Sequence, residues 1–421
     1  MFKFIHTADI HLDSPLHKLD DYEGAPVDEI RQATRRAFNN LVQTAISEDV
    51  NFILIAGDLY DGDWKDYNTG LYLVSQTSRL RDAGIPVYIV AGNHDAASKI
   101  TKTLRLPENV HLFPSDKPST YNIDNLNVTI HGQSFATPAM KKDLSLLYPT
   151  PVPGYFNIGI LHTCASGREN HEPYAPCTLE GLRSKGYDYW ALGHVHQYEV
   201  LLDDPPILFP GNIQGRHVRE TGPKGCVLVT VDDSDRPKIE FKPLDVIRWV
   251  IIEVDSNGAE SGYDIIERFC NRLENTLDEN EDRPLVARVL IQGETTVHSE
   301  LLANVDRWSN EIRAAALDTS GHRVWVEKIK INTRLPASEK KLRTSDGAMG
   351  ELVKLFDELA DKPDLLRDLS NELIDLEKKI PKELKQGRDG IRFDDIDWLK
   401  SLLEQVRPML IQGLMRKGSS E

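Results

Sequence analysis

Short apolar runs recur through the first 247 residues, and each is bounded by polar or glycine-bearing loops. They are too short for typical helices and suit strands that are covered on both faces of a sheet. The predicted strands are Phe2–Thr7, Asn51–Ala56, Val87–Ala91, Asn127–His131, Asn157–Leu161, Tyr187–Leu192 and Cys226–Val231.

Helical patterns lie between these runs. From Asp28 to Ser47 the apolar residues recur at spacings of three and four, which predicts a helix with one buried face. A second such stretch runs from Thr69 to Ala83 and ends at Gly84, a residue typical of helix ends. Strands that alternate with helices predict a layered α/β domain over residues 1–247.

The remaining residues predict a second, smaller α/β unit and a helical tail. Residues 336–350 are polar and predict a linker, and residues 351–421 carry apolar stripes at helical spacing. Within residues 248–335 the predicted strands are Trp249–Val254, Leu285–Gln292 and Val324–Asn332, and the predicted helices are Asp264–Leu277 and Leu301–Ala316.

The composition is that of a globular protein with an acidic balance. The 421 residues are 40% hydrophobic and 28% charged, with a formal net charge of −16. This length predicts two or three domains and a sizeable core. The negative charge argues against a protein that coats nucleic acid by charge alone.

The cysteines and the chain start predict a cytoplasmic protein. Cys164, Cys177, Cys226 and Cys270 are scattered and form no CxxC pair, so we expect reduced thiols rather than a zinc ribbon or a disulfide framework. The apolar run at the chain start is too short for a signal peptide, and no run reaches the length of a membrane span.

Asp, His and Asn residues follow five of the predicted strands. The carboxyl ends of strands in open α/β sheets are where ligands gather, so these side chains predict a metal site. A mixture of carboxylate, imidazole and amide suits manganese, magnesium, iron or zinc. We expect Gly57, Gly92 and Gly193 to supply permissive backbone beside this site. The residues are Asp9 and His11, Asp58, Asn93 and His94, His162, and His194 and His196.

This set of segments resembles the calcineurin-like metallophosphoesterase superfamily. Within it, the chain is most similar to the SbcD-type DNA double-strand-break repair nucleases, particularly the YhaO-like branch. The resemblance implies a four-layer α-β-β-α sandwich, a small capping domain that binds DNA at residues 248–335, and a DNA exonuclease activity, with endonuclease activity left open. It rests on His6-Thr7-Ala8-Asp9-Ile10-His11-Leu12-Asp13, Gly57-Asp58-Leu59-Tyr60-Asp61, Gly92-Asn93-His94-Asp95, Gly193-His194-Val195-His196 and Pro210-Gly211-Asn212.

The resemblance also implies a centre of two divalent metal ions. We expect manganese, with magnesium, iron or zinc also compatible with the ligands. Asp58 is expected to bridge the two ions. Carried over to this sequence, the ligands of the first ion are Asp9, His11, Asp58 and His196, and those of the second are Asp58, Asn93, His162 and His194.

Two further residues of the same segments have implied roles in catalysis. His94 is expected on the substrate side, as a general acid for the leaving alkoxide or as a donor to the phosphate. Asp61 is expected to orient the ring of His94, with a loop cap as the alternative. We expect Asp95 to cap the helix that follows it.

Contacts with the substrate are left open at two places. Arg216 and His217 lie in the one basic stretch beside the core and either touch phosphate or belong to a solvated loop. Trp64 and Lys65 either contact DNA or face solvent.

The tail has two interpretations. Its apolar stripes either form a small bundle on the chain itself or dock on a partner, which the resemblance identifies as an SMC-like (SbcC-type) ATPase. A homodimer is also expected in such nucleases. Two other functions remain open at this point: a phosphoesterase acting on a small nucleotide or another phosphodiester, and a non-catalytic subunit that tethers DNA ends.

Overall fold

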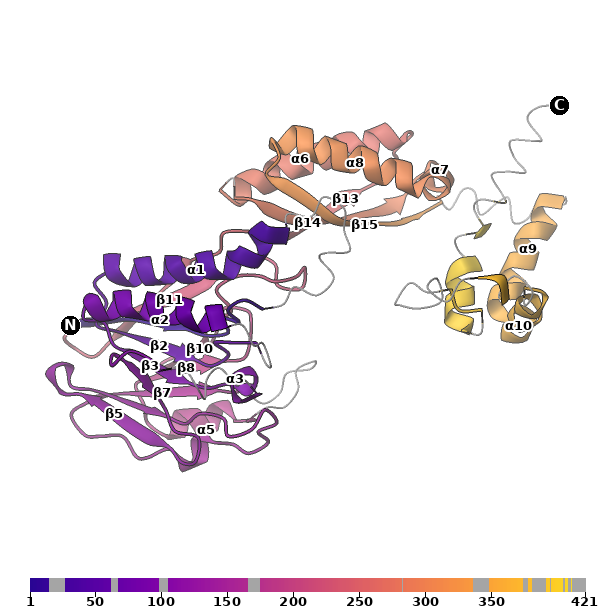
Figure 1. The fold of residues 1–421 in the computed structure, drawn as a ribbon. Coiled ribbons are helices and arrows are strands. Elements are labelled where there is room, and N and C mark those ends of the chain that lie inside the picture. Colours follow the sequence, from indigo (N-terminus) through magenta and orange to yellow (C-terminus); the bar gives the residue numbers. More distant parts are fainter. Residues whose placement is uncertain are drawn as a thin grey trace. The chain divides into compact units, whose positions relative to one another are not determined.

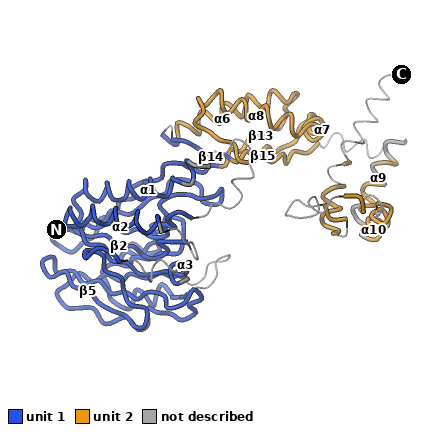
Figure 2. The backbone as a smooth tube through the Cα atoms, in the orientation of Figure 1, with its two compact units in different colours: residues 1–250, 280–287 blue, residues 251–279, 288–421 orange. Residues whose placement is uncertain are grey.

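The computed structural model has two compact units, Met1–Val250 with Asn280–Ala287 and Ile251–Glu279 with Arg288–Glu421 (Figure 2). Each is described by itself. The structure describes residues 1–14, 27–61, 67–97, 105–165, 175–281, 283–335, 348–373, 378–380, 391–393, 395–403, 406–407 and 410.

Unit 1 contains two mixed six-stranded sheets. The first has the order β12-β11-β1-β2-β3-β4, in which β1 to β4 are parallel, β11 is antiparallel to β1, and β12 is antiparallel to β11. Its strands are β1 (Phe2–Thr7), β2 (Phe52–Ala56), β3 (Val87–Val90), β4 (Val110–Leu112), β11 (Gly225–Val231) and β12 (Pro237–Pro243).

The second sheet has the order β5-β6-β7-β8-β10-β9. Its inner strands are parallel, and the edge strands β5 and β9 are antiparallel to their neighbours. Its strands are β5 (Ser119–Ile123), β6 (Val128–Gly132), β7 (Phe156–His162), β8 (Tyr189–Gly193), β9 (Glu199–Asp203) and β10 (Pro206–Phe209).

Alternating residues of the strands serve two different cores. Phe4 and Phe52 stack with their ring centroids 4.9 Å apart, and Tyr189 of the second sheet meets Phe4 edge-on at 5.2 Å, so these rings fill the space between the sheets. Ile5 and Ile53 point the other way and pack with α1 (Val27–Ser47) and α2 (Tyr67–Asp82). Each such side chain contributes about 1.5–3 kcal/mol by its burial.

The opposite face of the second sheet is covered as well. Trp190 and Phe209 of that sheet pack with Leu182 of α5 (Leu179–Ser184) in a third core. Helices therefore flank two stacked sheets, and the predicted α-β-β-α layering is confirmed (Figure 1).

The predicted strands are all present within two residues of their expected ends, and the helices over 28–47 and 69–83 are confirmed. Five strands of this unit were not predicted: β4, β5, β9, β10 and β12. Four of them lie at or next to a sheet edge and are half-exposed, so their sequences lack a long apolar run. β10 is buried but only four residues long and starts with Pro206.

A three-stranded sheet of β13 (Arg248–Asp255), β14 (Leu285–Glu294) and β15 (Val324–Arg334) follows. The helices beside it are α6 (Gly262–Glu279), α7 (His298–Ala303) and α8 (Val305–Ser320). The expected single helix over residues 301–316 is wrong, because the backbone leaves helical geometry at Asn304 and divides it into α7 and α8. The apolar period continues across the break and hides it in the sequence.

The tail contains α9 (Ala348–Asp361) and α10 (Pro363–Glu372), and Pro363 starts the second helix. Phe356, Leu366, Phe393 and Leu399 are buried there. Helix α9 includes residues 348–350 of the predicted linker, whose residues 336–347 lie outside the described part of the chain. Among the described residues no helix has the length and hydrophobicity needed to span a bilayer.

Candidate metal centre

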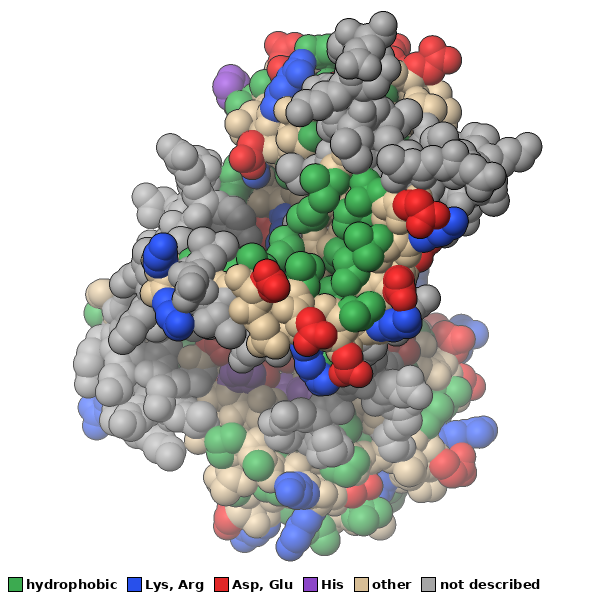
Figure 3. Space-filling view, turned by 90° about the vertical axis from the view of Figure 1, so that its right-hand side faces the viewer, with side chains coloured by type: hydrophobic (Ala, Val, Ile, Leu, Met, Phe, Trp, Pro, Cys, Tyr) green, Lys and Arg blue, Asp and Glu red, His purple; other side chains and the backbone are tan. Residues whose placement is uncertain are grey.

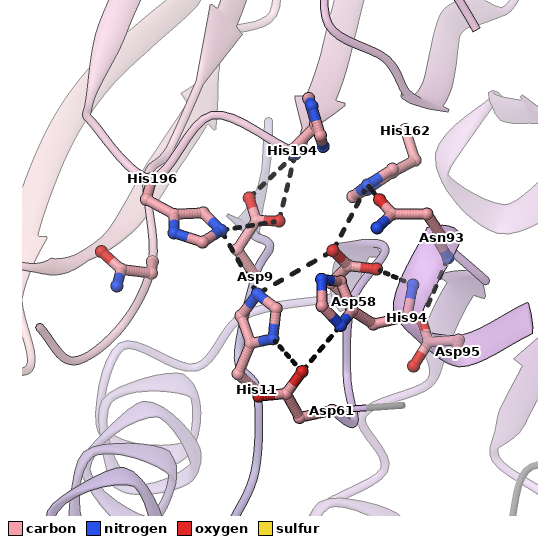
Figure 4. Close-up of polar contacts among 12 residues, drawn as sticks. Asp9, His11, Asp58, Asp61, Asn93, His94, Asp95, His162, His194 and His196 are labelled. Carbon is pink, nitrogen blue, oxygen red and sulfur yellow. Dashed lines mark hydrogen bonds and ion pairs between the residues drawn. The ribbon is translucent and has the colours of Figure 1, made fainter. Parts of the chain in front are cut away.

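The polar residues at the strand ends meet at one place in unit 1. They follow β1, β2 and β3 of one sheet and β7 and β8 of the other, and their side chains point toward one another (Figure 4). Among the residues that the structure describes, three groups each have ligand atoms that all lie within 4.8 Å of one another: Asp9, His11 and His196; His11, Asp58 and His94; and Asp58, His162 and His194.

The first group is built around the carboxylate of Asp9. The backbone N–H of His194 donates to both oxygens of Asp9, at 3.1 and 2.9 Å. His196 Nε2 lies 3.8 Å from Asp9 Oδ1 and 3.2 Å from His11 Nε2. Two imidazole nitrogens and a carboxylate thus face a common point.

The third group is built around Asp58, which also contacts His11 of the first. His162 Nε2 lies 3.5 Å from Asp58 Oδ2 and 3.0 Å from Asn93 Oδ1. His11 Nε2 lies 3.8 Å from the same oxygen of Asp58. Asp58 therefore stands between the two groups, as a bridging ligand must.

The electrostatics of the site suit a cation. Burial, together with the charge of Asp58, raises the pKa of Asp9 well above its ordinary value, and burial also raises the pKa of Asp58. Burial lowers the pKa of His162 to about 3, so its imidazole is neutral. The Nδ1 atom of His162 is 2.9 Å from the carbonyl oxygen of Ala56, which makes Nδ1 the donor and leaves the Nε2 lone pair toward Asp58. Desolvated carboxylates beside neutral imidazoles fit divalent ions.

The backbone of this site is strained. Asp9, His11, Asp58 and His194 have φ of 50°, 45°, 53° and 106°. Residues other than glycine seldom adopt positive φ, and each such residue costs on the order of 1–3 kcal/mol. Several strained residues at one place are typical of functional sites. The local sequence does not predict these positive φ values.

The three glycines of the site have two different roles. Gly57 has a φ of +97°, as expected of permissive backbone. For Gly92 and Gly193 that expectation is wrong, because neither has positive φ; they are needed for space. A Cβ at Gly92 would lie 2.3 Å from Asp58 Oδ1, and one at Gly193 would lie 1.9 Å from the carbonyl oxygen of Ala56.

The variant Gly92→Ala tests this packing. The new methyl group would displace the Asp58 carboxylate, so we expect a lower melting temperature and metal binding weakened by about 10–100-fold, the range found when support of a ligand is lost. Isothermal titration with Mn²⁺ measures the affinity. The control is Gly154→Ala, whose Cβ meets nothing within 4 Å although its φ is +81°; it carries strain without the clash. Equal metal affinity in both variants would contradict the argument.

His94, a member of the second group, forms a hydrogen-bonded pair with Asp61. His94 Nδ1 lies 2.7 Å from Asp61 Oδ1, and 40% of the His94 side chain is exposed. The hydrogen bond that His94 donates to Asp61 is the main cause that raises the pKa of His94. Asp61 also accepts a hydrogen bond from Ser14. The pair thus has the geometry of an imidazole oriented by a carboxylate.

Asp95 has a wider structural role than the helix cap expected of it. It accepts from the N–H of Gly92 at 3.0 Å, at the start of α3 (Asn93–Ala97). It also accepts from the N–H groups of Leu59 and Tyr60 at 3.2 and 2.9 Å. Asp95 therefore ties the loop that carries Asp58 to the loop that carries Asn93.

The basic stretch after β10 enters the site only in part. Arg216 is 14% exposed and lies 3.6 Å from Asp61 Oδ2 and 3.2 Å from Glu220 Oε1. His217 is 53% exposed at its side chain. Their roles toward the substrate stay predictions, and Trp64 and Lys65 lie outside the described residues.

Sequence reasoning missed Glu220, which is 5% exposed. Its Oε1 lies 2.7 Å from His196 Nδ1. Burial alone would raise the pKa of Glu220, but the hydrogen bond with His196 and the charge of Arg216 hold it well below its usual range. The only signal in the sequence is an acidic residue four positions after Arg216, which is too common to single out.

Two family models and several known proteins match this chain. The model described as Calcineurin-like phosphoesterase matches residues 2–198, and the model for the middle domain of Metallophosphoesterase YhaO matches residues 249–334. The chain is 35% identical over 297 residues to the Uncharacterized metallophosphoesterase YhaO of Bacillus subtilis (strain 168), covering 69% of this chain and 71% of that protein.

More distant relatives carry the name DNA double-strand break repair protein Mre11. The protein from Sulfurisphaera tokodaii is 24% identical over 324 residues, covering 73% of this chain and 78% of its own length. The protein from Aeropyrum pernix is 28% identical over 380 residues, covering 83% and 85%. From the matched segments and the YhaO relative, the chain belongs to the calcineurin-like metallophosphoesterase family.

Proposed function

We propose that this chain is a metal-dependent nuclease of the SbcD type that hydrolyses phosphodiester bonds of DNA during repair. The observation that carries the proposal is the meeting of seven side chains with oxygen or nitrogen donors, two of which are the buried carboxylates Asp9 and Asp58, with the His94–Asp61 pair beside them. The choice of DNA as substrate is supported by the similarity to proteins named for DNA double-strand break repair.

The proposed ligands divide between two ions. Two divalent ions, when bound, supply an activated water and neutralise charge on the phosphate. Manganese is the proposed metal. Asp9, His11, Asp58 and His196 would hold the first ion, and Asp58, Asn93, His162 and His194 would hold the second.

The chain's own residues would handle the leaving group. Asp61 holds Nδ1 of His94 at 2.7 Å, so the proton available to the substrate is the one on Nε2. We assign His94 the donation of that proton to the departing alkoxide, a step that contributes about 10²–10⁴-fold in comparable enzymes. Arg216 contacts Asp61, so it helps to fix the position of this pair.

We propose that most of the affinity for DNA is supplied by partner subunits rather than by the metal site. The net charge of −16 disfavours broad electrostatic binding of DNA, and bound ions would supply positive charge where the phosphate must lie. We propose that the tail docks on an SMC-like ATPase and that the chain forms a homodimer. Leu355, Leu369 and Leu410 of the tail are each nearly half exposed, and hydrophobic side chains gather in one group in the view of Figure 3.

The test is a cleavage assay on end-labelled linear duplex DNA with and without Mn²⁺. We expect metal-dependent release of labelled products, lost when a chelator is added. Parallel assays on a cyclic nucleotide and on a phosphopeptide separate the nuclease from other phosphoesterases. Faster turnover of either small substrate, with no cleavage of DNA, would overturn the proposal.

A further inference from the structure

A buried carboxylate lies behind one of the proposed metal ligands. Glu220 follows β10 in the chain and is 5% exposed. Its Oε1 is 2.7 Å from His196 Nδ1, on the opposite side of the ring from the Nε2 that lies 3.8 Å from Asp9. The imidazole therefore stands between a carboxylate outside the donor group and one inside it.

The contact determines which nitrogen of His196 carries a proton. A nitrogen and a carboxylate oxygen 2.7 Å apart need a hydrogen between them, and the carboxylate of Glu220 has none to give. Nδ1 must then be the donor. Arg216 Nη2 lies 3.2 Å from both Nδ1 and Glu220 Oε1, and its N–H is likewise satisfied by the carboxylate. This leaves Nε2 with a bare lone pair.

Glu220 is itself held in one place from several directions. Its Oε2 accepts from the backbone N–H of Arg216 at 2.8 Å and from Asn212 Nδ2 at 3.0 Å. Lys224, which is 3% exposed, donates to the carbonyl oxygen of His196 at 2.7 Å. The ring and the backbone of His196 are thus both anchored by the segment over residues 212–224.

From this geometry we infer that Glu220 is a positioning residue for the metal centre, which sets the tautomer and the ring orientation of His196. The inference rests on the proposed function for its metal assignment. Carboxylates that accept from the outer nitrogen of a metal-binding imidazole raise its basicity and fix its direction, and their loss costs about 10–100-fold in metal affinity. The effect should be confined to the ion that His196 holds.

Arg216 extends the role of Glu220 across the site. Its guanidinium lies 3.2 Å from Glu220 Oε1 and 3.6 Å from Asp61 Oδ2. It therefore links the carboxylate behind His196 with the carboxylate behind His94. Loss of Glu220 would leave Arg216 beside Asp61 and beside Nδ1 of His196, so His196 is expected to be disturbed more than His94.

The experiment titrates Mn²⁺ into the full chain and its variants by calorimetry. Glu220→Ala should lose about 10–100-fold in affinity at one of two sites and leave the other unchanged. Glu220→Gln keeps an oxygen acceptor, so its Mn²⁺ affinity should lie between those of the wild type and Glu220→Ala. The control is Asp188→Ala, which removes a half-buried carboxylate that accepts from the N–H of Asn157 away from the site.

A spectroscopic measurement separates positioning from a general loss of stability. In metal-free protein with ¹⁵N-labelled histidine, His196 should show a protonated Nδ1 and a bare Nε2, and Glu220→Ala should convert it to a mixture of tautomers. His196→Gln assigns the signal. A structural role alone would lower the melting temperature and leave the tautomer unchanged.

The outcomes distinguish this inference from the proposed function. If Glu220→Ala binds both ions as the wild type does, or loses both to the same degree, the inference is overturned while cleavage of DNA by the wild type stands. If the wild type binds two ions and cleaves no DNA, the proposed substrate is wrong and the role of Glu220 is retained.

Discussion

His94→Ala is expected to reduce hydrolysis of DNA by about 10²–10⁴-fold, the usual contribution of a general acid. Metal binding should be unchanged, because His94 is outside the proposed ligand set and its imidazole is held by Asp61 rather than by the carboxylates that face the ions. The measurements are the cleavage rate at saturating Mn²⁺ and the Mn²⁺ affinity by calorimetry. Asp61→Asn should give a smaller loss, since the amide oxygen still accepts from Nδ1.

A matched control removes a histidine elsewhere in the same unit. His111 lies in β4 and stacks on Tyr88 with the ring centroids 5.0 Å apart, so His111→Ala should lower stability slightly and leave the rate unchanged. Cleavage by His94→Ala at the wild-type rate would refute the proposed role. Loss of Mn²⁺ binding in that variant would instead place His94 among the ligands.

Asp58→Asn is expected to have opposite effects on stability with and without metal. Burial raises the pKa of Asp58, so the metal-free fold loses stability as the pH rises through that pKa and the carboxylate ionises. The neutral amide avoids this cost and can still accept from the N–H of His94, which lies 2.9 Å from Oδ1. The metal-free variant should therefore melt at a higher temperature than the wild type at neutral pH.

With metal present, Asp58→Asn should lack the increase in stability that bound metal gives the wild type. An ion at 100 times its dissociation constant stabilises the fold by about 2.7 kcal/mol, and a variant that lacks the bridging carboxylate should show almost none of this. Thermal melts with Mn²⁺ and with a chelator measure both effects. Asp188→Asn should keep the metal-induced shift. A full shift in Asp58→Asn would show that this carboxylate does not bridge the ions.

The central strands and the donor residues could be predicted because their signals are local. Apolar runs such as Asn51–Ala56 and Asn157–Leu161 belong to strands that are buried on both faces. Such strands have apolar residues at consecutive positions, which makes them recognisable in the sequence. The placement of Asp58 and His162 directly at strand ends is equally local. The rule that strand ends converge at one edge then brought residues far apart in the sequence to one site.

Edge strands and helix breaks could not be predicted from the pattern of neighbouring residues alone. Ser119–Ile123 alternates between half-buried and exposed residues and is a strand only because it pairs with β6. The break at Asn304 interrupts the backbone of a helix without interrupting its apolar period. For Ser119–Ile123 the outcome depends on the neighbouring strand rather than on the residues themselves.

The sequence by itself determined which donor residues stand at the carboxyl ends of the strands, because both the apolar runs and the polar residues that end them are local features. Only the tertiary structure decided how they are held. Glu220 reaches His196 across 24 positions of the chain, Gly92 must be small because Asp58 lies against it, and Asp95 ties two loops together. These are contacts between segments distant along the chain, which exist only after both sheets have packed.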